Sequence, residues 1–572
     1  MTVRRVVLTA TGVVTAMSLA LPAHAGPTKP RQVTEQTTEY VVLYKEGVPA
    51  ERARAAVQAA GGTILRENTA VGVATVRAAA GFAAAARRQA ALEGAAVNRV
   101  IGHAPKPVRG LHERFSVEKE GRHILRRKDP RGGARGEEPL ANLQWDMKQI
   151  GATGSGAHKA EEGDRRVLVG VIDTGIDGSH PDIAPNFNRR LSRNFTTDIP
   201  VDANGNEVDG PCEVPSCVDP ADVDDNDHGT HVASTIASPR NGLGIAGVAP
   251  RVSLVNLRAG QDSGYFFLQA TVDALTYAGD VGIDVVNMSF YVDPWLFNCV
   301  DNPADSAADQ AEQRVVIEAT QRALDYARAR GVTLIAAAGN QAADYTKPYV
   351  DTSSPNYASE PGESPRERQI PPSCVSMPSE GKGVVPVSAT GPSKRKAYYS
   401  SFGNGYIAVA APGGDKYDTA DGKLDHNAGI WAAYPERLAR QRGELNADGT
   451  PNVPYVIRSC KGGTCAYYQS LQGTSMAAPH AAGVAALIVS RYGKRDRSGL
   501  GLDPRITESI LRSSATATAC PKGGSYTYRR QVQSPDGSFT EVVTSHTCEG
   551  SKKRNGFYGN GIINASAAVG GR

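Results

Sequence analysis

The chain has 572 residues, which is long enough to form more than one domain, each with its own hydrophobic core. Hydrophobic residues make up 40% of the sequence and charged residues 21%, which is ordinary for a soluble protein. The formal net charge of +4 is small for this length, so the composition gives no reason to expect a nucleic-acid partner.

The N-terminus predicts an export signal. Arg4 and Arg5 supply a positive start, residues 6–21 an apolar stretch, and the Ala-His-Ala run at 23–25 a small-x-small cleavage site. A membrane anchor is the alternative, but this stretch is short and interrupted by threonines, and no later segment is long enough to span a bilayer. We therefore expect residues 1–25 to be removed and the mature protein to be secreted, extracellular and free of the membrane. The paired arginines also fit a twin-arginine signal, and the sequence does not separate the two export routes.

Residues 26–105 predict a small α+β domain. Its expected elements are strands at 40–44, 63–65, 71–76 and 97–101 and helices at 50–60 and 80–92. In chain order they give β-α-β-β-α-β, which is the ferredoxin-like pattern.

The next segment, residues 106–138, is predicted to be a basic linker. From Arg99 through Arg135, Lys and Arg number 11 against 4 Asp and Glu, without clear periodicity. An exposed linker of this kind is a favoured place for proteolytic nicking, so we expect the maturation cleavage between here and Leu140. A nucleic-acid-binding arm is the alternative, but the segment lacks interleaved aromatic residues that would stack on bases.

From residue 139 to residue 572, predicted strands and helices alternate. Strands are expected at 167–172, 252–257, 285–288, 333–337, 383–387 and 407–410, and helices at 228–237, 269–278, 315–330 and 474–491. This alternation predicts an α/β fold of three layers, in which a mostly parallel sheet lies between helices on both faces.

This domain also contains segments outside the alternating pattern. Stretches rich in Gly, Pro, Asp and Ser are expected to be surface insertions, at 200–223, 291–311, 341–379 and 415–461. The tail from residue 503 offers a helix and then a hairpin between Cys520 and Cys548.

Four short blocks of this domain place polar side chains where catalysis can use them. An apolar strand stops abruptly at Asp173, His228 begins a helix of small residues, and Asn340 follows an alanine-rich strand and a glycine. Ser475 follows a Gly-Thr turn and opens another small-residue helix, whose N-terminus favours developing negative charge. Taken singly, each has a structural alternative as a strand-end cap, a turn residue or a helix N-cap.

Together these blocks resemble the signature segments of the subtilase (subtilisin-like) serine peptidases, of the secreted bacterial type with an inhibitory prodomain. The chain order Asp173, His228, Ser475 is the order of subtilisins. The resemblance runs from about residue 145 to the end of the chain, where 558–565 resembles the closing element of the family. It implies that Ser475 is the nucleophile, His228 the proton shuttle, Asp173 its orienting group, and the amide of Asn340 an oxyanion donor.

The resemblance also implies that residues 26–105 are an inhibitory prodomain, although a small independent binding domain is the alternative. His231, three residues after the catalytic histidine, is expected to be structural. The residues implied for substrate binding are Ser263, Gly264, Ser289, Tyr291, Ala338 and Gly339, the first two on a strand that pairs with substrate. Here the chain departs from the family, because Ser-Phe-Tyr-Val at 289–292 replaces Ser-Leu-Gly-Gly. Tyr291 is therefore expected to narrow the cleft or to cap a subsite.

A structural calcium ion is the only cofactor that the resemblance suggests. Oxygen atoms of Asp182, Asn241, Leu243 and Ile245 resemble the ligands of the family's tight calcium loop and suit a hard cation. A second cluster, at 202–206 with Asp209, is as readily a solvated acidic turn. No catalytic cofactor is expected.

All eight cysteines lie between Cys212 and Cys548, and an even number in an exported protein predicts disulfides. Their spacing favours pairs of neighbours, namely Cys212–Cys217, Cys299–Cys374, Cys460–Cys465 and Cys520–Cys548. A zinc site is the alternative, but no pair has the close C-x₂-C spacing and nearby histidines are few.

The sequence therefore predicts a secreted, monomeric serine endopeptidase that acts on polypeptides through an acyl-enzyme and is made as a self-processing zymogen. A serine esterase is disfavoured, because Gly-Thr-Ser-Met-Ala lacks the second glycine of the nucleophile elbow. A catalytically inactive or cleft-blocked binding scaffold stays open because of Tyr291. A dedicated maturation protease with one partner is a further alternative.

Overall fold

A computed structural model describes residues 37–97, 117–122, 137–201, 207–356, 364–495, 499–534 and 536–571. All of them belong to one unit, Thr37–Arg572. The expected export signal at 1–25 lies outside the described residues. Of the predicted linker, only 117–122 and 137–138 are described.

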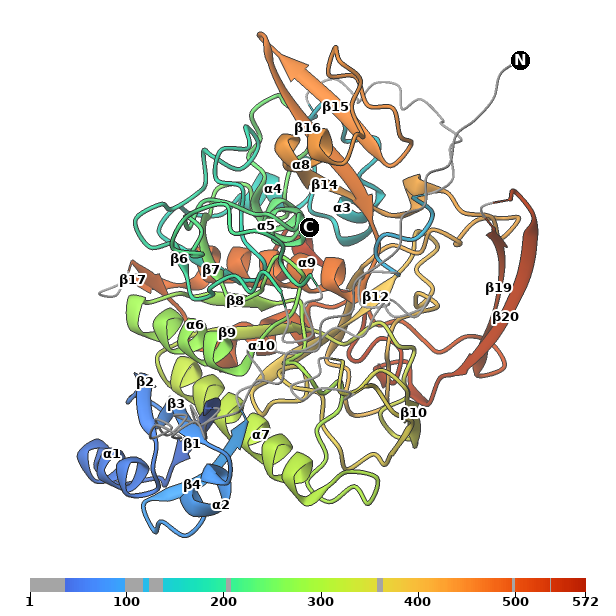
Figure 1. The fold of residues 1–572 in the computed structure, drawn as a ribbon. Coiled ribbons are helices and arrows are strands. Elements are labelled where there is room, and N and C mark those ends of the chain that lie inside the picture. The colour runs from blue at the N-terminus through green and yellow to red at the C-terminus, as the bar shows by residue number, and fades with distance from the viewer. Residues whose placement is uncertain are drawn as a thin grey trace, which may run out of the picture. The chain divides into compact units, whose positions relative to one another are not determined.

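A seven-stranded parallel sheet forms the centre of the second domain (Figure 1). Its strands, in spatial order, are β13 (Val409–Pro412), β12 (Val384–Thr390), β9 (Thr333–Ala337), β8 (Val285–Met288), β5 (Leu168–Ile172), β7 (Ser253–Arg258) and β6 (Arg193–Asn194). Neighbouring strands pair in parallel throughout. Every residue of β5, β8 and β9 is buried, which explains why these strands are continuous apolar runs rather than alternating ones.

Helices cover both faces of this sheet. The main ones are α5 (His228–Ala237), α6 (Leu268–Val281), α7 (Ala307–Ala329), α9 (Thr474–Tyr492) and α10 (Pro504–Ser513). Val169 and Val171 of β5 pack into the core with α5 and α9, whereas Leu168 and Ile172 pack into the opposite core with α6 and α7. The predicted three-layer α/β fold is thus confirmed.

Shorter elements complete this domain. The helices are α3 (Trp145–Ile150), α4 (Ala157–Ala160), α8 (Glu436–Gln441), α11 (Ala565–Ala568) and a 3₁₀ turn at His426–Ala428. The strands are β10 (Tyr349–Asp351), β11 (Arg368–Ile370), β14 (Ile430–Tyr434), β15 (Val456–Lys461), β16 (Thr464–Leu471), β17 (Lys494–Arg495), β18 (Leu500–Gly501), β19 (Ser525–Gln533), β20 (Phe539–Thr547), β21 (Gly550–Ser551) and β22 (Arg554–Asn555). The long pair β19–β20 is the hairpin expected between Cys520 and Cys548.

Two of the predicted surface insertions are in large part buried, so that prediction was wrong for them. Within 415–461, strand β14 joins the sheet β14-β16-β15, and its Trp431 and Tyr434 are buried. Within 291–311, Trp295 is fully buried under the guanidinium of Arg368, whose carbon lies 4.7 Å from the ring centroid. Their Gly, Pro, Asp and Ser content obscured these few large side chains, which form small cores beside the main one.

The N-terminal domain is an antiparallel sheet in the order β2-β3-β1-β4 with two helices. Its elements are β1 (Thr37–Tyr44), α1 (Ala50–Ala59), β2 (Thr63–Asn68), β3 (Val73–Ala79), α2 (Phe82–Ala86) and β4 (Leu92–Val97). The predicted β-α-β-β-α-β order is confirmed. However, the helix expected at 80–92 is only α2. Strand β4 begins at Leu92, and Leu92, Ala95 and Ala96 are buried where it pairs with β1; residues 98–101 of the strand expected at 97–101 lie outside the described residues.

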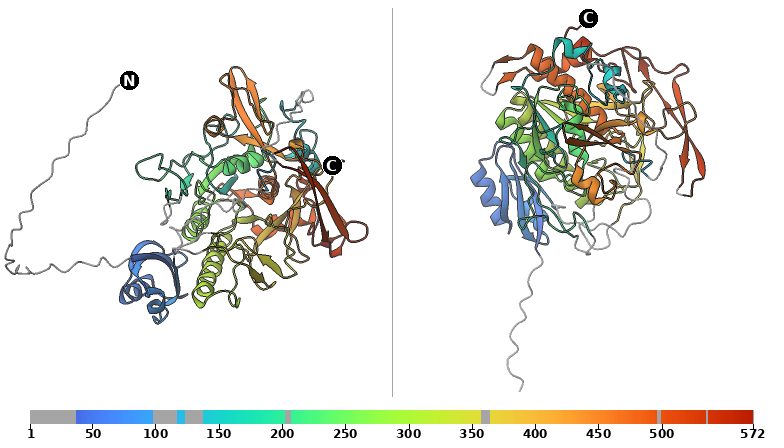
Figure 2. Two further views of the ribbon diagram at one scale, coloured as in Figure 1. Left: turned by 45° about the vertical axis from the view of Figure 1, so that its right-hand side comes forward. Right: turned by 90° about the horizontal axis from the view of Figure 1, so that it is seen from above.

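The face of this small sheet that carries Val41, Leu43 and Val73 shares a core with α6 and α7. Both views of Figure 2 show the N-terminal domain, in blue, beside these two helices. Arg66 pairs with Asp273 of α6 at 2.7 Å. The N-terminal domain is therefore packed against the helices below the central sheet.

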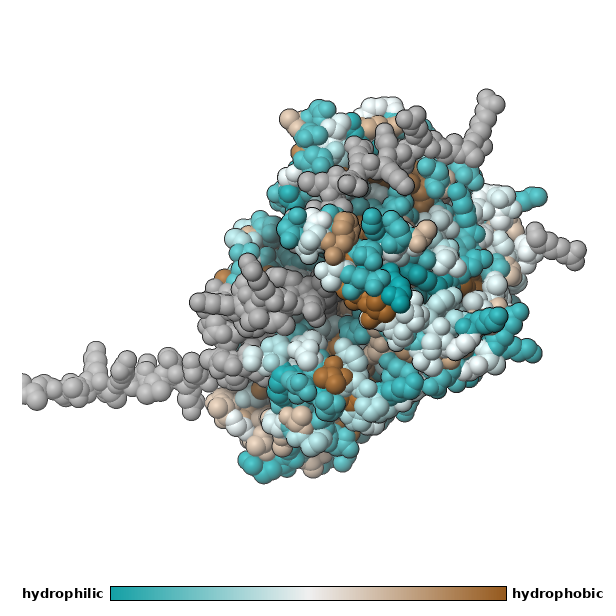
Figure 3. Space-filling model, turned by 90° about the vertical axis from the view of Figure 1, so that its right-hand side faces the viewer, coloured by the Kyte–Doolittle hydropathy of each residue, from teal (hydrophilic) through white to brown (hydrophobic). Residues whose placement is uncertain are grey.

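All four predicted disulfides are present, joining Cys212–Cys217, Cys299–Cys374, Cys460–Cys465 and Cys520–Cys548. Hydrophilic and neutral residues cover most of the face drawn in Figure 3. Among the described helices, none has the length and apolar character needed to cross a membrane.

Candidate active site

Two of the predicted catalytic residues meet at the carboxyl edge of the central sheet. Asp173 directly follows β5, and His228 is the first residue of α5. His228 Nδ1 lies 2.7 Å from Asp173 Oδ1, and the backbone N–H of Thr174 also donates to that oxygen at 2.8 Å. Both side chains are almost fully buried, so this contact is shielded from solvent. The carboxylate thereby fixes the ring orientation and keeps the proton of the imidazole on Nδ1.

Ser475 and Asn340 lie on the neighbouring elements. Ser475 is in the first turn of α9, and Asn340 follows β9. Asn340 Oδ1 accepts hydrogen bonds from Thr474 N at 2.9 Å and from Thr474 Oγ1 at 2.8 Å. These two contacts direct the Nδ2 group of Asn340 toward the region in front of Ser475, where an oxyanion would form.

The carboxylate of Glu118 fills the space between these groups. Its Oε1 accepts from Ser475 Oγ at 2.6 Å and from Asn340 Nδ2 at 3.2 Å. Its Oε2 lies 3.4 Å from His228 Nε2. The Glu118 side chain is only 2% exposed. One carboxylate therefore contacts the hydroxyl, the imidazole and the amide at the same time.

The backbone of Glu118 is held away from the serine. Its carbonyl oxygen accepts from the backbone N–H of Gln472 at 3.3 Å and from Lys416 Nζ at 3.2 Å. The Nε2 group of Gln472 also donates to the carbonyl of Val117 at 3.0 Å. The segment is thus bound through its peptide groups while a side chain, and not a carbonyl, faces Ser475.

Further contacts hold the rest of segment 117–122. Lys119 pairs with Asp227 at 2.9 Å, and Arg122 Nη2 donates to Gln469 at 2.5 Å. The carboxylate of Glu120 accepts from the hydroxyl of Tyr417 at 2.9 Å and from that of Tyr398. The prediction of an exposed linker was therefore wrong for these six residues. Glu118 was also missed as a site residue, because its partners are far away in the sequence.

The charges around His228 follow from this arrangement. Burial lowers the pKa of His228, but the carboxylates of Asp173 and Glu118 outweigh burial and raise that pKa well above its ordinary value. Burial raises the pKa of Asp227, but Lys119 and Arg442 outweigh it and hold that pKa well below its ordinary range. The two carboxylates thus favour the protonated form of His228.

Comparison with known proteins identifies the family. A family model described as the Subtilase family matches residues 164–561. The chain belongs to the subtilase family. Over 362 residues it is 28% identical to Subtilisin DY of Bacillus licheniformis, covering 63% of this chain and 86% of that protein. Over 386 residues it is 26% identical to Thermitase of Thermoactinomyces vulgaris, covering 67% of this chain and 90% of that protein. This subtilase is accordingly a serine endopeptidase.

Solved structures share its fold. The epidermin leader peptide processing serine protease of Staphylococcus aureus aligns with a TM-score of 0.57 at 19% identity, over 93% of this chain and 98% of that one. Fervidolysin of Fervidobacterium pennivorans aligns with a TM-score of 0.52 at 21% identity, over 95% of this chain and 62% of that one. At these identities the likeness concerns the fold alone.

A small pocket opens beside Ser475 in this subtilase. Its cavity is about 50 Å³, and Gly264, Ser289, Tyr291 and Gly339 are among the lining residues. The hydroxyl of Tyr291 accepts a hydrogen bond from the amide of Asn356 at 2.9 Å, which holds the ring in place. The pocket is therefore built around most of the expected substrate-binding residues.

Two of the expected binding residues, Ser263 and Ala338, do not line this pocket. The hydroxyl of Ser263 donates to Asp209 at 2.8 Å, and the backbone N–H of Ala338 donates to the carbonyl of Val387 in β12 at 3.0 Å. A wall of the pocket that the sequence did not predict comes from Phe266, stacked on Phe290 with centroids 4.1 Å apart.

The residues expected to bind calcium in a tight loop lie together but bond to one another. Asp182 accepts from Asn241 Nδ2 at 3.0 Å and from the N–H of Ile245 at 3.3 Å, and Leu243 N–H donates to Asn241 Oδ1 at 2.8 Å. The ammonium group of Lys461 contacts the carbonyl oxygen of Asn241. Burial raises the pKa of Asp182 to about 8. These contacts engage the side-chain oxygens of Asp182 and Asn241, and calcium at this loop stays a prediction.

His231 has the structural environment that the sequence predicted. Its Nε2 lies 3.0 Å from the carbonyl oxygen of Ile430, and the ring is fully buried. Burial lowers the pKa of His231 to about 3, so the ring is neutral and donates to that carbonyl. Residues 202–206, which with Asp209 form the second cluster considered for calcium, lie outside the described residues.

Proposed function

We propose that this chain is the precursor of a secreted serine endopeptidase that uses Asp173, His228 and Ser475 as its catalytic triad. The observation that carries this proposal is the 2.7 Å contact of His228 Nδ1 with Asp173, at the same sheet edge as the hydroxyl of Ser475. An inactive scaffold is disfavoured, because every group that acyl transfer requires is present and placed by rigid elements.

The chemistry follows from these positions once Glu118 has left. Ser475 Oγ attacks the scissile carbonyl carbon and passes its proton to Nε2 of His228. Asp173 stabilises the imidazolium that forms, and Nδ2 of Asn340 donates to the oxyanion. His228 then protonates the leaving amine, which leaves an acyl-enzyme on Ser475. Water attacks this ester by the same route, with His228 again as the base, and the acid product and free Ser475 are released.

Glu118 supports an inhibited precursor. Its carboxylate accepts a hydrogen bond from Ser475 Oγ and occupies the Nδ2 donor of Asn340 that an oxyanion would use. The carboxylates on both sides of His228 raise its pKa and so oppose its action as a base while Glu118 is in place. No water or substrate carbonyl can take the same position, because two groups cannot share this volume. We infer that segment 117–122 inhibits the precursor from within the catalytic site.

The same pose argues against cleavage inside the segment while it is bound in this way. The carbonyl carbon of Glu118 belongs to a group that binds Gln472 and Lys416 rather than the oxyanion donors. Nucleophilic attack requires a carbonyl within near-attack distance of the serine oxygen. Self-processing would therefore require the segment to shift, or a bond elsewhere in 106–138 to enter the cleft.

Each part of the chain has its own role in this precursor. Residues 1–25 would direct export, 26–105 would act as an inhibitory prodomain through its packing on α6 and α7, and 139–572 would be the mature, monomeric, extracellular enzyme. Its substrates would be polypeptides, with neither nucleic acid nor a membrane as a partner. Structural calcium belongs to this proposal as well.

A second candidate function is the maturation of one partner, as the name of the epidermin leader peptide processing protease indicates for that protein. The small pocket lined by Tyr291 favours restricted specificity. A peptide library would decide: cleavage of a few sequences supports the maturation role, and broad cleavage supports a degradative one.

The triad is tested by labelling with a fluorophosphonate probe and by N-terminal sequencing. The secreted wild type should be labelled and should begin after residue 105, whereas Ser475→Ala should be unlabelled and keep its prodomain. Absence of labelling in a matured, folded wild type would contradict the catalytic role. Identical N-termini in both proteins would show that the precursor does not cut itself.

A further inference from the structure

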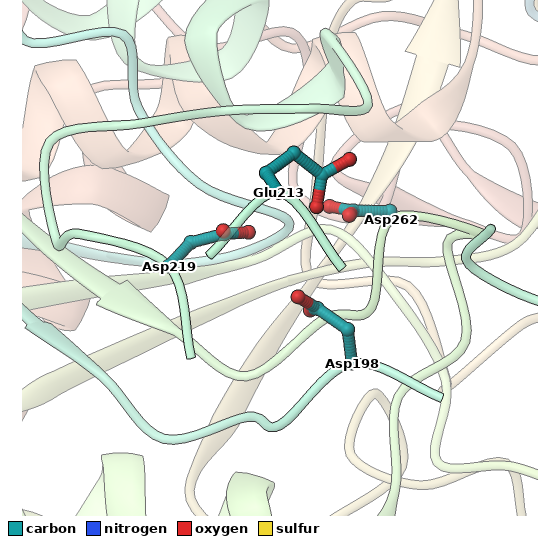
Figure 4. Close-up of side chains that lie close together, drawn as sticks. All are labelled: Asp198, Glu213, Asp219 and Asp262. Atoms are coloured by element: carbon teal, nitrogen blue, oxygen red, sulfur yellow. The ribbon is translucent and has the colours of Figure 1, made fainter. Parts of the chain in front are cut away.

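Four carboxyl groups converge next to the strand expected to bind substrate (Figure 4). They belong to Asp198, Glu213, Asp219 and Asp262, and one oxygen of each lies within 4.8 Å of the others. Three separate segments bring them together: the first follows β6, the last follows β7, and the middle two lie in the 200–223 insertion. The disulfide Cys212–Cys217 closes a short loop that contains Glu213 and so restrains this part of the insertion.

One buried cation faces this cluster. The fully buried guanidinium of Arg258 lies 2.7 Å from Asp219, 2.7 Å from Asp262 and 3.4 Å from Asp198. Arg437, which is also close to Glu213, forms its own ion pair with another acid, Asp225. One guanidinium against four carboxylates leaves the cluster strongly negative.

The second oxygens of the three aspartates point to a ligand. Asp198 Oδ2, Asp219 Oδ1 and Asp262 Oδ2 are buried and have no hydrogen-bond partner among the described residues. The Asp198 and Asp219 side chains are at least nine-tenths buried. A buried carboxylate oxygen without a donor or a cation is costly, and such groups in native proteins normally have a partner.

The side-chain Oε1 of Gln261, the residue before Asp262, is also buried and without a partner among the described residues. The Nε2 group of the same amide donates to the carbonyl of Thr197, the residue before Asp198, at 3.2 Å. The amide is thus anchored between two of the segments that supply the carboxylates.

We propose that Asp198, Glu213, Asp219 and Asp262 bind a calcium ion. Two oxygens that each lie 2.3–2.6 Å from one ion are at most about 5 Å apart, which agrees with the spacing of these four groups. Calcium accepts six to eight oxygen ligands in irregular geometry, so Gln261 and main-chain carbonyls can complete its shell. An all-oxygen set excludes the nitrogen and sulfur donors that zinc prefers.

The position of the ion gives it a role in the proposed enzyme. The carbonyl of Asp262 accepts from the amide of Asn226 at 2.7 Å, and Asn226 Oδ1 accepts from the N–H of His228 at 3.3 Å. Asp262 also directly precedes the expected binding strand, Ser263–Gly264. The ion would therefore fix that strand against the start of α5, and this consequence for activity rests on the proposed function.

The test uses the full-length Ser475→Ala protein, which cannot cut itself, stripped of metal and titrated with CaCl₂ by calorimetry. We expect one calcium ion to bind and the unfolding temperature to rise with calcium. Glu213→Gln should weaken binding at least tenfold; because this side chain is exposed, the substitution should not disturb folding. Glu207→Gln, the same change at another exposed acid of this insertion, is the matched control and should bind as the parent does.

Two results would overturn the proposal. One is no calcium binding by Ser475→Ala, which would leave the cluster to share protons. The other is unchanged binding in Glu213→Gln together with its loss in Asp182→Asn, which would place the ion in the tight loop. MgCl₂ in place of CaCl₂ should bind at least tenfold more weakly, and equal binding would contradict calcium selectivity. Because binding is measured on a protein without the serine, the outcome is independent of whether the chain is a peptidase.

Discussion

The carboxylate of Glu118 accepts a hydrogen bond of 2.6 Å from the hydroxyl of Ser475, although the two residues are 357 positions apart. The same carboxylate reaches the amide of Asn340 and the imidazole of His228. Hydrogen bonds to charged groups are worth about 1.5–3 kcal/mol each, so this contact adds to the other contacts that hold segment 117–122 in the cleft. It implies that the serine becomes available only when segment 117–122 leaves.

Replacing Glu118 should therefore activate the precursor. In Glu118→Gln the side chain keeps its size but loses the charge that pairs with His228. We expect the full-length protein to react with a fluorophosphonate probe about tenfold faster or more, in line with the loss of one charge-assisted contact. Glu137→Gln, an exposed acid outside the segment, is the control and should react at the parental rate. Equal rates for the parent and Glu118→Gln would contradict an inhibitory role.

The inhibited state should weaken as pH rises. The pKa of His228 is raised because its charged form is stabilised by Asp173 and Glu118, against burial. A raised pKa stabilises the closed arrangement fully below the ordinary pKa of histidine, and this contribution is lost as pH rises through the raised value. Labelling of the full-length protein should thus accelerate at alkaline pH. In Glu118→Gln the acceleration should occur at lower pH, and an unchanged profile would argue against the pairing.

Much of the site could be predicted because the decisive signals are local. The apolar run that stops at Asp173 and the small-residue helices that start at His228 and near Ser475 each describe their own element. Parallel strands then place their carboxyl ends at one edge. The four disulfides also followed from spacing, because each of them joins two cysteines that are neighbours in the order of the sequence.

Other features have no local signal. Glu118 lies between basic residues in a segment without periodicity, and its partners Lys416 and Gln472 follow it by about 300 and about 350 residues. The acidic cluster is likewise assembled from three segments, so Asp262 and Glu213 meet only in the fold. Alternation of apolar and polar residues identifies elements, but it does not show which distant side chain enters a cleft.

Asn340 should act on the chemical step. In the mature enzyme, Asn340→Ala should lower kcat by about 10²–10³ with little change in KM, as expected when a single oxyanion donor is removed. The substitution also removes the acceptor for Thr474, so Thr474→Val, which loses only the hydroxyl contact, is the comparison. We expect the valine variant to keep most of the activity. A rise in KM with unchanged kcat in Asn340→Ala would instead assign the amide to substrate binding.

Tyr291 should limit the size of the residue that binds beside the cut. Its ring lines the small cavity, and its hydroxyl is held by Asn356. Tyr291→Ala should raise kcat/KM for peptides with large side chains at this position by about tenfold, since each methylene in a pocket is worth 1–3 kcal/mol. Tyr291→Phe keeps the ring and should leave the preference unchanged. If the phenylalanine variant shows the same shift, the hydroxyl contact and not the ring sets the preference.

Lys416 should anchor the inhibitory segment. Its ammonium group donates to the carbonyls of Glu118 at 3.2 Å and of Glu120 at 3.0 Å, and burial lowers its pKa to about 7. The peptide bond after Lys119 should accordingly resist trypsin in full-length Ser475→Ala. Adding Lys416→Met should expose that bond and raise its cleavage rate about tenfold, because two hydrogen bonds are lost. The exposed Lys423→Met is the control and should leave the bond protected.

Peptide mapping by mass spectrometry gives the rate at this one bond, and thermal unfolding verifies that each variant is folded. Rapid trypsin cleavage after Lys119 in Ser475→Ala itself, at the rate of exposed lysines, would show that the segment does not occupy the cleft in solution. Protection that persists in Lys416→Met would instead assign the anchoring to Gln472, whose backbone N–H donates to the same carbonyl of Glu118 at 3.3 Å.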